Sequence, residues 1–474
     1  MKKIFWGSLL ISIWIVILFW GKNIGLSMLL LVVPFLYFLI SLLESKNKIK
    51  YKEPKILIIP IILLSSTYFI FDNSFFNSLN LIVISGLIIF MIIRFMEDKL
   101  NIDKLFLRFI ELILDPLTRI ELTMNKIKLY ITSNFKFIKK DNKENNILKG
   151  ILITIPFVII IIVLLASADD VFSNIFSQIF NSIFQVLGKF KLTTIIFKLI
   201  TIIALFMYFS CFFHNLIFEY EVINEDIAKT EIKDKTTIKI LLSALNIIYI
   251  LFCFIQIRSL FMGKNDVSNY SQYARKGFFQ LMIVSVINLA VILFAKKVEK
   301  NKYINLMCLL MVICTFIILL SSAYRMYLYE SAYGYTRLRL LVYVALLTEA
   351  ILLIPTIIYI MDKKINLSQV YISIIIVMYV GINFSNVDNI ITKSNVNRYF
   401  EIGVFDVEYL KKETGYDAIK ELIRIRDSEA KMQEEEDVKY KIDIYLSEMY
   451  EKLEKEEMDF RNLNLSKLIA KKMY

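Results

Sequence analysis

Long apolar runs recur along most of the chain, and this feature limits its fold more than any other. A helical run of about 18 residues, rising about 1.5 Å per residue, is long enough to cross roughly 30 Å of hydrocarbon. The runs are continuous rather than alternating, which indicates spanning helices and not the strands of a barrel. We count about eleven such runs, at 4–20, 25–43, 56–71, 79–96, 147–167, 194–217, 238–261, 278–295, 303–322, 338–361 and 368–384.

The predicted fold class is therefore all-α: a polytopic integral membrane helix bundle with a small C-terminal helical soluble domain. The composition agrees, because 57% of the 474 residues are hydrophobic. The first run follows Met1-Lys2-Lys3, as in a signal peptide, yet no small-x-small cleavage site comes after it. We therefore predict an uncleaved first helix.

Changes in composition predict four parts of the chain. They are a four-span group at 1–96, an amphipathic cytoplasmic connector at 97–146, a seven-span core at 147–385 and a C-terminal helical domain at 386–474. The connector is typical of two amphipathic helices that break at Asp115-Pro116, because proline interrupts a helix. We expect it either to lie on the membrane or to serve as a docking platform for a cytoplasmic protein.

The distribution of Lys and Arg orients the predicted spans, since cytoplasmic loops are enriched in these residues. With the N-terminus inside, the lysine-rich loops at 46–55, 99–149, 296–302 and 363–364 all face the cytoplasm. The intervening loops are poorer in Lys and Arg. We therefore predict a multi-pass protein of the cell membrane, with a cytoplasmic N-terminus and an extracytoplasmic C-terminus.

The C-terminal domain is rich in Glu and Lys and has helical periodicity. Gly415 stands where a glycine that ends a helix is expected. Two interpretations are open, a helical hairpin packed on the outer loops or a lid that grips a protein partner or a substrate. The mixed charges favour a solvated surface.

A pair of carboxylates follows the fifth predicted span. Ser167 and Asp170 have the spacing of a capping box, and Asp169 lies beside them. Carboxylates are also stabilised at the positive end of a helix dipole. We interpret the three residues as a helix cap, with an acidic ligand-binding or catalytic site as the alternative. The residues that follow, 172–187, predict an amphipathic helix in the membrane interface.

Several arginines depart from the positive-inside pattern, because they fall on predicted outer segments. A guanidinium binds phosphate or carboxylate through two parallel hydrogen bonds. One interpretation is that these arginines reach lipid headgroups or pair with Glu330, Asp169, Asp170 or Asp388. The other is a site for an anionic headgroup or an envelope precursor. The residues concerned are Arg275, Arg325, Arg337 and Arg339.

Glu349 is an ionisable residue deep inside a predicted span. A carboxylate there is costly and normally faces the bundle interior, either paired or protonated. One interpretation is a neutral Glu that is hydrogen-bonded to the backbone or to a polar residue of another span. The other is intramembrane coupling to protons or ions. The candidate polar partners are Asn246, Asn288 and Gln256, with Lys198 and Arg258 as alternatives.

The usual catalytic and cofactor signatures are missing from the sequence. There is no phosphate-binding Gly-rich loop and no zinc-protease pair of histidines, and His214 is the single histidine. The four cysteines fall inside predicted spans without metal-ligand spacing. We predict no catalytic residues, no metal and no cofactor. Nucleic acid is not expected as a partner, because the net charge of +12 is explained by the inner loops.

Four motifs occur in order: SADDVF, YARKGFFQL, YGYTRLRL and NVDNIITKSNVNRYF followed by DVEYL. Together they resemble a bacterial polytopic membrane family known as domain of unknown function 4173, allied to 4153. The resemblance implies a membrane location and no established activity.

We therefore expect a membrane protein that is structural, sensory or scaffolding in the cell envelope. The alternatives are a transporter or flippase of an anionic lipid or envelope precursor, and a lipid-linked transferase. The expected partners are membrane lipids, such an anionic lipid or precursor, and a protein bound at the tail or the connector.

Overall fold

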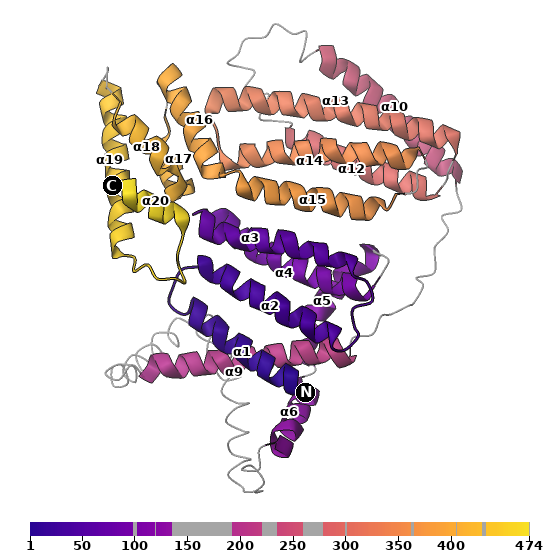
Figure 1. Cartoon of the computed structure of the whole chain (residues 1–474). Coiled ribbons are helices and arrows are strands. Elements are labelled where there is room, and N and C mark those ends of the chain that lie inside the picture. The colour runs from indigo at the N-terminus through magenta and orange to yellow at the C-terminus, as the bar shows by residue number, and fades with distance from the viewer. Residues whose placement is uncertain are drawn as a thin grey trace, which may run out of the picture. The chain divides into compact units, whose positions relative to one another are not determined.

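The computed structural model describes most of the chain, and its regular structure there is helical (Figure 1). The described residues are 1–97, 102–118, 120–134, 192–219, 235–258, 278–298, 301–361, 365–403, 405–428 and 433–473. The all-α fold class is confirmed for this part of the chain.

Within the described ranges, 10 helices are long and apolar enough to cross a membrane. Each coincides with a predicted run, and the remaining run, 147–167, lies outside the described residues. The helices are α1 (Lys2–Phe19), α2 (Leu26–Glu44), α3 (Ile58–Ile70) with the preceding η1 (Glu53–Leu57), α4 (Ser74–Met96), α9 (Leu192–His214), α10 (Lys235–Gln256), α12 (Phe278–Val298), α13 (Lys302–Tyr333), α14 (Arg337–Ile360) and α15 (Leu367–Phe384).

The chain forms two compact units. Unit 1 comprises Met1–Asn23, Val33–Lys52 and Asn101–Val222, and unit 2 comprises Ile24–Val32, Glu53–Leu100 and Ile223–Tyr474. In unit 1, α1 packs along α9, which ends in the π-helical turn η3 (Asn215–Glu219). Aromatic contacts contribute to this unit, and the rings of Phe38 and Phe213 lie edge to face at 5.1 Å.

The predicted connector contains two helices of unit 1, α5 (Ile102–Thr118) and α6 (Ile120–Asn134), which both contact α9. The predicted break at Asp115-Pro116 is wrong, because α5 continues through Pro116. A proline so close to a helix end removes a single hydrogen bond of the last turn. One face of α5 exposes Leu107, Leu114 and Leu117, as expected for a helix in a membrane interface.

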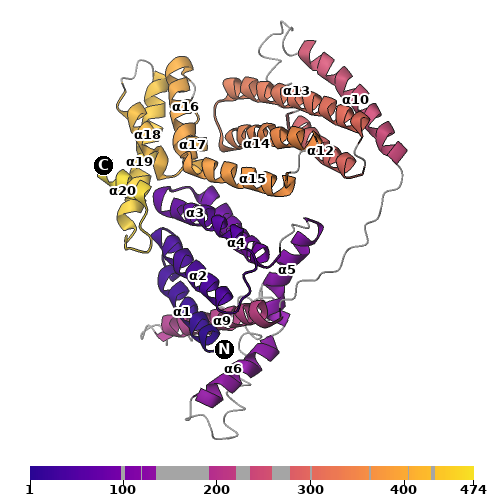
Figure 2. The ribbon, with the colours of Figure 1, turned by 45° about the vertical axis from the view of Figure 1, so that its right-hand side comes forward.

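Unit 2 contains a group of spanning helices, in which α12, α13, α14 and α15 run side by side and α10 lies along α13 (Figures 1 and 2). Their shared core is aliphatic, with residues such as Met311, Leu346 and Leu353. α13 has 32 residues and continues well beyond the predicted run at 303–322. The predicted outer segment 324–339 therefore begins as helix, and Arg325 is part of that helix.

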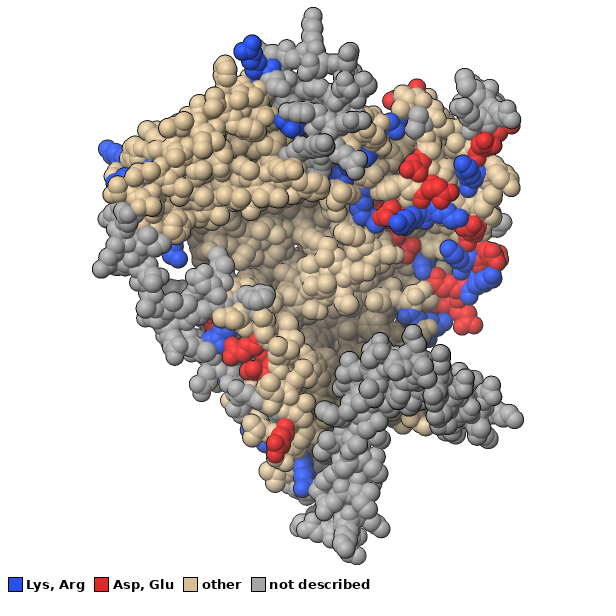
Figure 3. All heavy atoms as spheres, turned by 180° about the vertical axis from the view of Figure 1, so that it is seen from behind, with Lys and Arg blue, Asp and Glu red and all other residues tan. Residues whose placement is uncertain are grey.

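The C-terminal helices gather at one end of α12–α15 (Figures 1 and 2). They enclose a second core that includes Val396, Leu422 and Leu446. The elements are α16 (Val387–Ile402), α17 (Val407–Glu413), η5 (Tyr416–Ala418), α18 (Ile419–Arg426), α19 (Gln433–Lys455) and α20 (Leu465–Met473). Charged side chains cluster over these helices, whereas the long apolar helices present few (Figure 3). The part from Val387 onward is called the tail below.

The segment before α20 holds the tail against the ends of two spanning helices. The first free N–H groups of α2 are satisfied, since Leu26 N donates to Leu463 O at 3.0 Å and Ser27 N donates to Arg461 O at 2.9 Å. The last carbonyls of α3 receive the Asn464 side-chain amide, which donates to Tyr68 O at 3.0 Å and to Phe71 O at 2.9 Å. In the described residues the tail is therefore packed onto helix ends.

Candidate functional site

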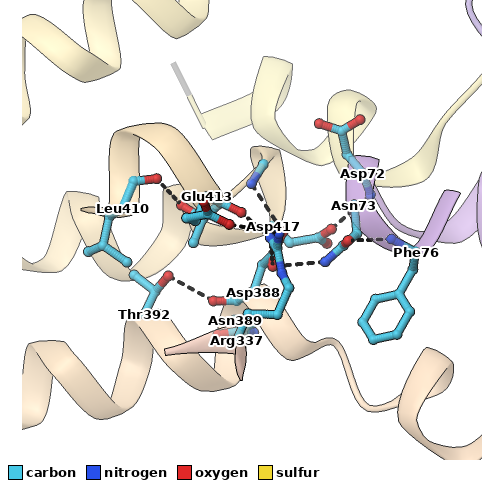
Figure 4. A network of polar contacts seen from close by, with 12 residues as sticks. Asp72, Asn73, Phe76, Arg337, Asp388, Asn389, Thr392, Leu410, Glu413 and Asp417 are labelled. Atoms are coloured by element: carbon cyan, nitrogen blue, oxygen red, sulfur yellow. Dashed lines mark hydrogen bonds and ion pairs between the residues drawn. The ribbon is translucent and has the colours of Figure 1, made fainter. Parts of the chain in front are cut away.

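A cluster of polar and charged residues lies where the tail meets the spanning helices of unit 2 (Figure 4). It is called the polar junction here. Each residue comes from the end of a helix: Arg337 is the first residue of α14, Asp388 lies in the first turn of α16, and Asn73 is the N-cap of α4. The full set is Asp72, Asn73, Arg337, Asp388, Glu413, Gly415 and Asp417.

Arg337 joins two helices of the tail to the start of α14. Its Nη2 lies 3.0 Å from Asp388 Oδ1 and its Nη1 lies 3.1 Å from Glu413 Oε2. Nη2 also donates to the main-chain carbonyl of Glu413, and the guanidinium carbon lies 5.4 Å from the centre of the Phe75 ring. The side chains of Arg337 and Asp388 are 11% and 1% exposed, so water screens this ion pair little.

Asp388 accepts hydrogen bonds on both carboxylate oxygens. Oδ1 receives Asn73 Nδ2 at 2.8 Å as well as Arg337, and Oδ2 receives the main-chain N–H of Gly415 at 3.1 Å. Burial raises the pKa of Asp388, and the positive charge of Arg337 opposes this effect. Three donors from separate segments, one of them charged, therefore converge on one carboxylate, and hydrogen bonds of this kind favour its ionised form. Asn73 Oδ1 in turn caps α4 by accepting from Phe76 N at 3.0 Å.

Gly415 allows the main chain of the tail to approach the α3–α4 loop. A Cβ atom on Gly415 would lie 2.0 Å from the carbonyl oxygen of Asp72. Gly415 was predicted to cap the end of a helix; α17 ends at Glu413 with Thr414 as its C-cap, and Gly415 follows with a φ of −96°. The glycine is needed for space and not for positive φ.

Asp417 links three further segments at the edge of the junction. Its carboxylate accepts from Asp72 N at 2.8 Å, from Ser466 Oγ at 2.5 Å and from Asn386 Nδ2 at 3.4 Å. Burial raises the pKa of Asp417 to about 6. A cavity of about 10 Å³, lined in part by Asp388 and Asp417, lies beneath it. That volume suffices for about one water molecule.

Glu349 lies in the middle of α14 and bonds to a residue that the sequence did not suggest. Its carboxyl oxygen Oε2 contacts Ser285 Oγ of α12, and the side chain is buried. The predicted polar partners bond elsewhere: Asn246 donates to Met307 O, Asn288 donates to Thr315 Oγ1 and Gln256 accepts from Ser321.

The predicted anion-binding arginines do not form one cluster. Arg325 donates to Gln256 Oε1 at 3.0 Å. Arg339 donates to the carbonyl of Gly334, and its guanidinium carbon lies 4.2 Å from the centre of the Tyr329 ring. Arg337 alone of these three belongs to the polar junction. Arg275, Ser167, Asp169 and Asp170 lie outside the described residues. Headgroup binding and the acidic cap remain predictions.

Most members of the polar junction were not predicted from the sequence. Asp388 was predicted only as a possible partner of an arginine. Asn73, Glu413 and Asp417 were not predicted, nor was Ser466, which bonds to Asp417. One available signal is the position of Asn73 directly before an apolar run, which is typical of an N-cap. Among the described residues, no group of three or more His, Cys, Asp or Glu side chains has an arrangement that could hold a metal ion.

Residues 58–425 match the model of a domain of unknown function, DUF4153. The match covers more than half of the chain. The chain belongs to the DUF4153 family. The resemblance proposed from motifs named the allied family 4173 first, and the match is to 4153. No curated protein and no solved structure matches the chain.

The DUF4153 match begins at the start of α3 and ends in α18, so it includes Glu349 and the whole polar junction. It does not include α19, α20 or the segment around Asn464 that holds the tail against α2 and α3. Since DUF4153 has no assigned activity, the function of this member rests on its own geometry.

Proposed function

We propose that this protein is a structural or scaffolding component of the bacterial cell envelope, whose spanning helices hold a folded helical tail on the extracytoplasmic side. The single observation that carries this proposal is the double ion pair of Arg337 with Asp388 of α16 and Glu413 of α17. A buried charge that is fully used inside the protein fixes one element on another. A sensory role is a variant of the same proposal, because the burial of Asp417 connects the seating of the tail with pH.

The arrangement of helix ends supports the proposed orientation. The turns at 24–27, 71–74 and 334–337 were all predicted to lie outside the cell. Leu26 bonds to Leu463, Asp72 bonds to Tyr416 and Arg337 bonds to Glu413, so all three turns meet the tail. The distribution of Lys and Arg supports a position of this end outside the cell and of the N-terminus in the cytoplasm.

Cysteine labelling tests the orientation. In a chain without its four native cysteines, Lys3→Cys and Lys455→Cys each supply one thiol at an end of the protein. A membrane-impermeant maleimide should label Lys455→Cys in intact cells and Lys3→Cys only after lysis. Labelling of both in intact cells, or of neither, contradicts an extracytoplasmic tail.

A flippase or transporter of an anionic lipid or envelope precursor is the main alternative, and a lipid-linked transferase is the other. An anionic headgroup at Arg337 would have to displace two carboxylates, which argues against this residue as an open anion site. Arg339 contacts the neutral carbonyl of Gly334 and the rings of Tyr329 and Tyr333, so it is the better probe of anion binding.

The deciding experiment compares tail docking with lipid movement. Arg337→Ala should expose the tail to protease and abolish complementation of a strain that lacks the protein, whereas Arg339→Ala should affect neither. Proteoliposomes of the wild-type protein should not accelerate dithionite quenching of fluorescent phosphatidylglycerol in the inner leaflet. Protein-dependent quenching that Arg339→Ala removes, or full complementation by a variant with an undocked tail, overturns the proposal.

A further inference from the structure

Buried polar side chains form a line through the apolar helices of unit 2. At one end Lys296 Nζ donates to Asn305 Oδ1 at 2.7 Å, and at the other end Gln256 accepts from Ser321 and Arg325. Between them, Asn288 bonds to Thr315, and Ser285 bonds to Glu349. From Asn305 to Arg325 α13 rises roughly 30 Å at about 1.5 Å per residue, which is the thickness of the hydrocarbon.

The hydrogen bonds of Ser285 indicate which form of Glu349 is present. The hydroxyl has one proton to donate. Ser285 Oγ lies 2.7 Å from the carbonyl oxygen of Met282, which can only accept, and it also contacts Glu349 Oε2. Two full hydrogen bonds form only if Ser285 donates to Met282 and a protonated Glu349 donates to Ser285, because an ionised Glu349 would have to share the single hydroxyl proton with Met282. The arrangement therefore favours a proton on the carboxyl of Glu349.

The charges around Glu349 agree with a neutral acid. Among the described residues, Glu349 has no ion-pair partner, and an isolated carboxylate in an apolar interior is costly. Five charged or titratable groups on the helices that pack against α14 bond elsewhere. On α12, Lys296 bonds to Asn305. On α13, Arg325 bonds to Gln256, and Glu330 bonds to Tyr335 and Tyr343. Tyr371 on α15 bonds to Thr356, and Asp388 on α16 bonds to Arg337.

A second observation comes from the next turn of α12. Asn288 is fully buried, its Nδ2 donates to Thr315 Oγ1 at 3.0 Å, and its Oδ1 has no hydrogen-bond partner. A buried acceptor without a partner is costly and points to a ligand. Residues three apart share a helix face, so this acceptor lies one turn from Ser285 and the acid that it contacts.

We propose that Glu349, Ser285 and Asn288 form an intramembrane proton-binding site, in which the neutral carboxyl of Glu349 holds the exchangeable proton. When the proton leaves, Ser285 is the only donor at the site, so its hydroxyl hydrogen bond goes to Met282, to the Glu349 carboxylate or is shared between them. At least one of the two hydrogen bonds is then weakened, so proton release changes the contact between α12 and α14. The site goes beyond a scaffolding role, which requires no titratable group inside the membrane.

Carbodiimide labelling tests the proposal, because dicyclohexylcarbodiimide adds to a protonated carboxylic acid in apolar surroundings and leaves a stable acylurea. The full-length protein in native membranes is treated across a range of pH, and the label is located by peptide mass spectrometry. We expect the label on Glu349, decreasing about tenfold for each pH unit above the midpoint of its titration. Glu349→Gln should remove the label. Glu330 is another buried glutamate, in α13, and the control variant Glu330→Gln should still be labelled at Glu349.

Ser285→Ala separates a proton site from a merely structural contact. This variant should still be labelled at Glu349, with a shifted pH midpoint, because the acid loses the hydroxyl that it contacts. Unlabelled Glu349 in the folded wild-type protein overturns the proposal, as does labelling that does not change with pH. Protection by sodium chloride but not by potassium chloride assigns the site to Na⁺ and overturns the assignment to a proton. These outcomes are independent of whether the tail is docked, so they do not test the scaffolding role.

Discussion

Asp388 and Glu349 are both buried carboxyl groups of unit 2, yet they differ in the number and charge of their polar partners. Asp388 meets a guanidinium, a side-chain amide and a main-chain N–H. Glu349 meets a single hydroxyl among its described contacts. The difference follows from position, because helix ends supply free N–H groups and admit charged residues, whereas the middle of a span offers mostly apolar side chains. Asp388 therefore has the partners that favour an ionised acid, whereas Glu349 has the surroundings that favour a neutral one.

Removal of Arg337 should have the largest effect on this comparison. Arg337→Ala leaves Asp388 buried without its counter-charge, and breaking a buried ion pair from one side costs about 3 to 5 kcal/mol. We expect a lower midpoint of thermal unfolding in detergent and faster proteolysis within the tail. Arg426→Ala, at a more exposed pair with Asp427, is the matched control and should have a much smaller effect, because water screens an exposed ion pair. Equal effects of the two variants contradict the account.

Gly415→Ala tests whether the close approach of the main chains matters. The new methyl group would meet the carbonyl of Asp72, and overpacking of this kind costs about 1 to 3 kcal/mol. The expected result is loosened docking, measured as hydrogen exchange of the main-chain amides in α17 and η5. Gly381→Ala is the control, because nothing lies within 4 Å of a Cβ there. Unchanged exchange in Gly415→Ala would falsify the proposed contact.

Mild acid should strengthen the docking of the tail through Asp417. Its pKa is about 6 in the folded protein, against an ordinary value of 3.8. The folded state therefore binds the proton more tightly than the unfolded state, so the stabilisation is present below about pH 4 and is lost as the pH rises through about 6. From pH 7.5 to pH 5 we expect a gain of roughly 1 to 3 kcal/mol.

Thermal unfolding at the two pH values measures this gain, and Asp417→Asn should make it much smaller. Burial also raises the pKa values of Asp72 and Asp388, so both act in the same direction and leave a residual dependence. A tail that becomes less stable between pH 7.5 and pH 5 has the opposite sign and contradicts the prediction.

Glu349→Gln should have the smallest effect on stability, and it tests most directly whether Glu349 and Asp388 differ in charge. The amide keeps the shape of a neutral acid and can donate to Ser285, so the expected change is less than about 1 kcal/mol. Asp388→Asn is the matched variant, and it should cost more because Arg337 loses a charged partner. The measurement is the thermal midpoint of each purified variant. If Glu349→Gln is the more destabilising of the two, the distinction between a neutral and an ionised acid fails.

The candidate sites were only partly predictable. Glu349 was found because an acid inside an apolar run is visible in the sequence, but its partner was not, since Ser285 is one of many small residues in the spans. Arg337 was predicted as one of several candidate anion-binding arginines, and the sequence does not distinguish it from Arg325 and Arg339. Their partners depend on which helix ends meet, and local patterns carry no information on that.

The sequence by itself determined the helical class, the positions of the spanning helices and the charged tail, because length and hydropathy are local properties of a segment. The tertiary structure decided that Asp72, Arg337, Asp388 and Glu413 meet, and that Glu349 contacts Ser285. The physical reason is that such contacts join helix ends and helix faces that are between 51 and 344 residues apart in the sequence. Their free energy comes from burial and hydrogen-bond geometry that exist only once the chain has folded.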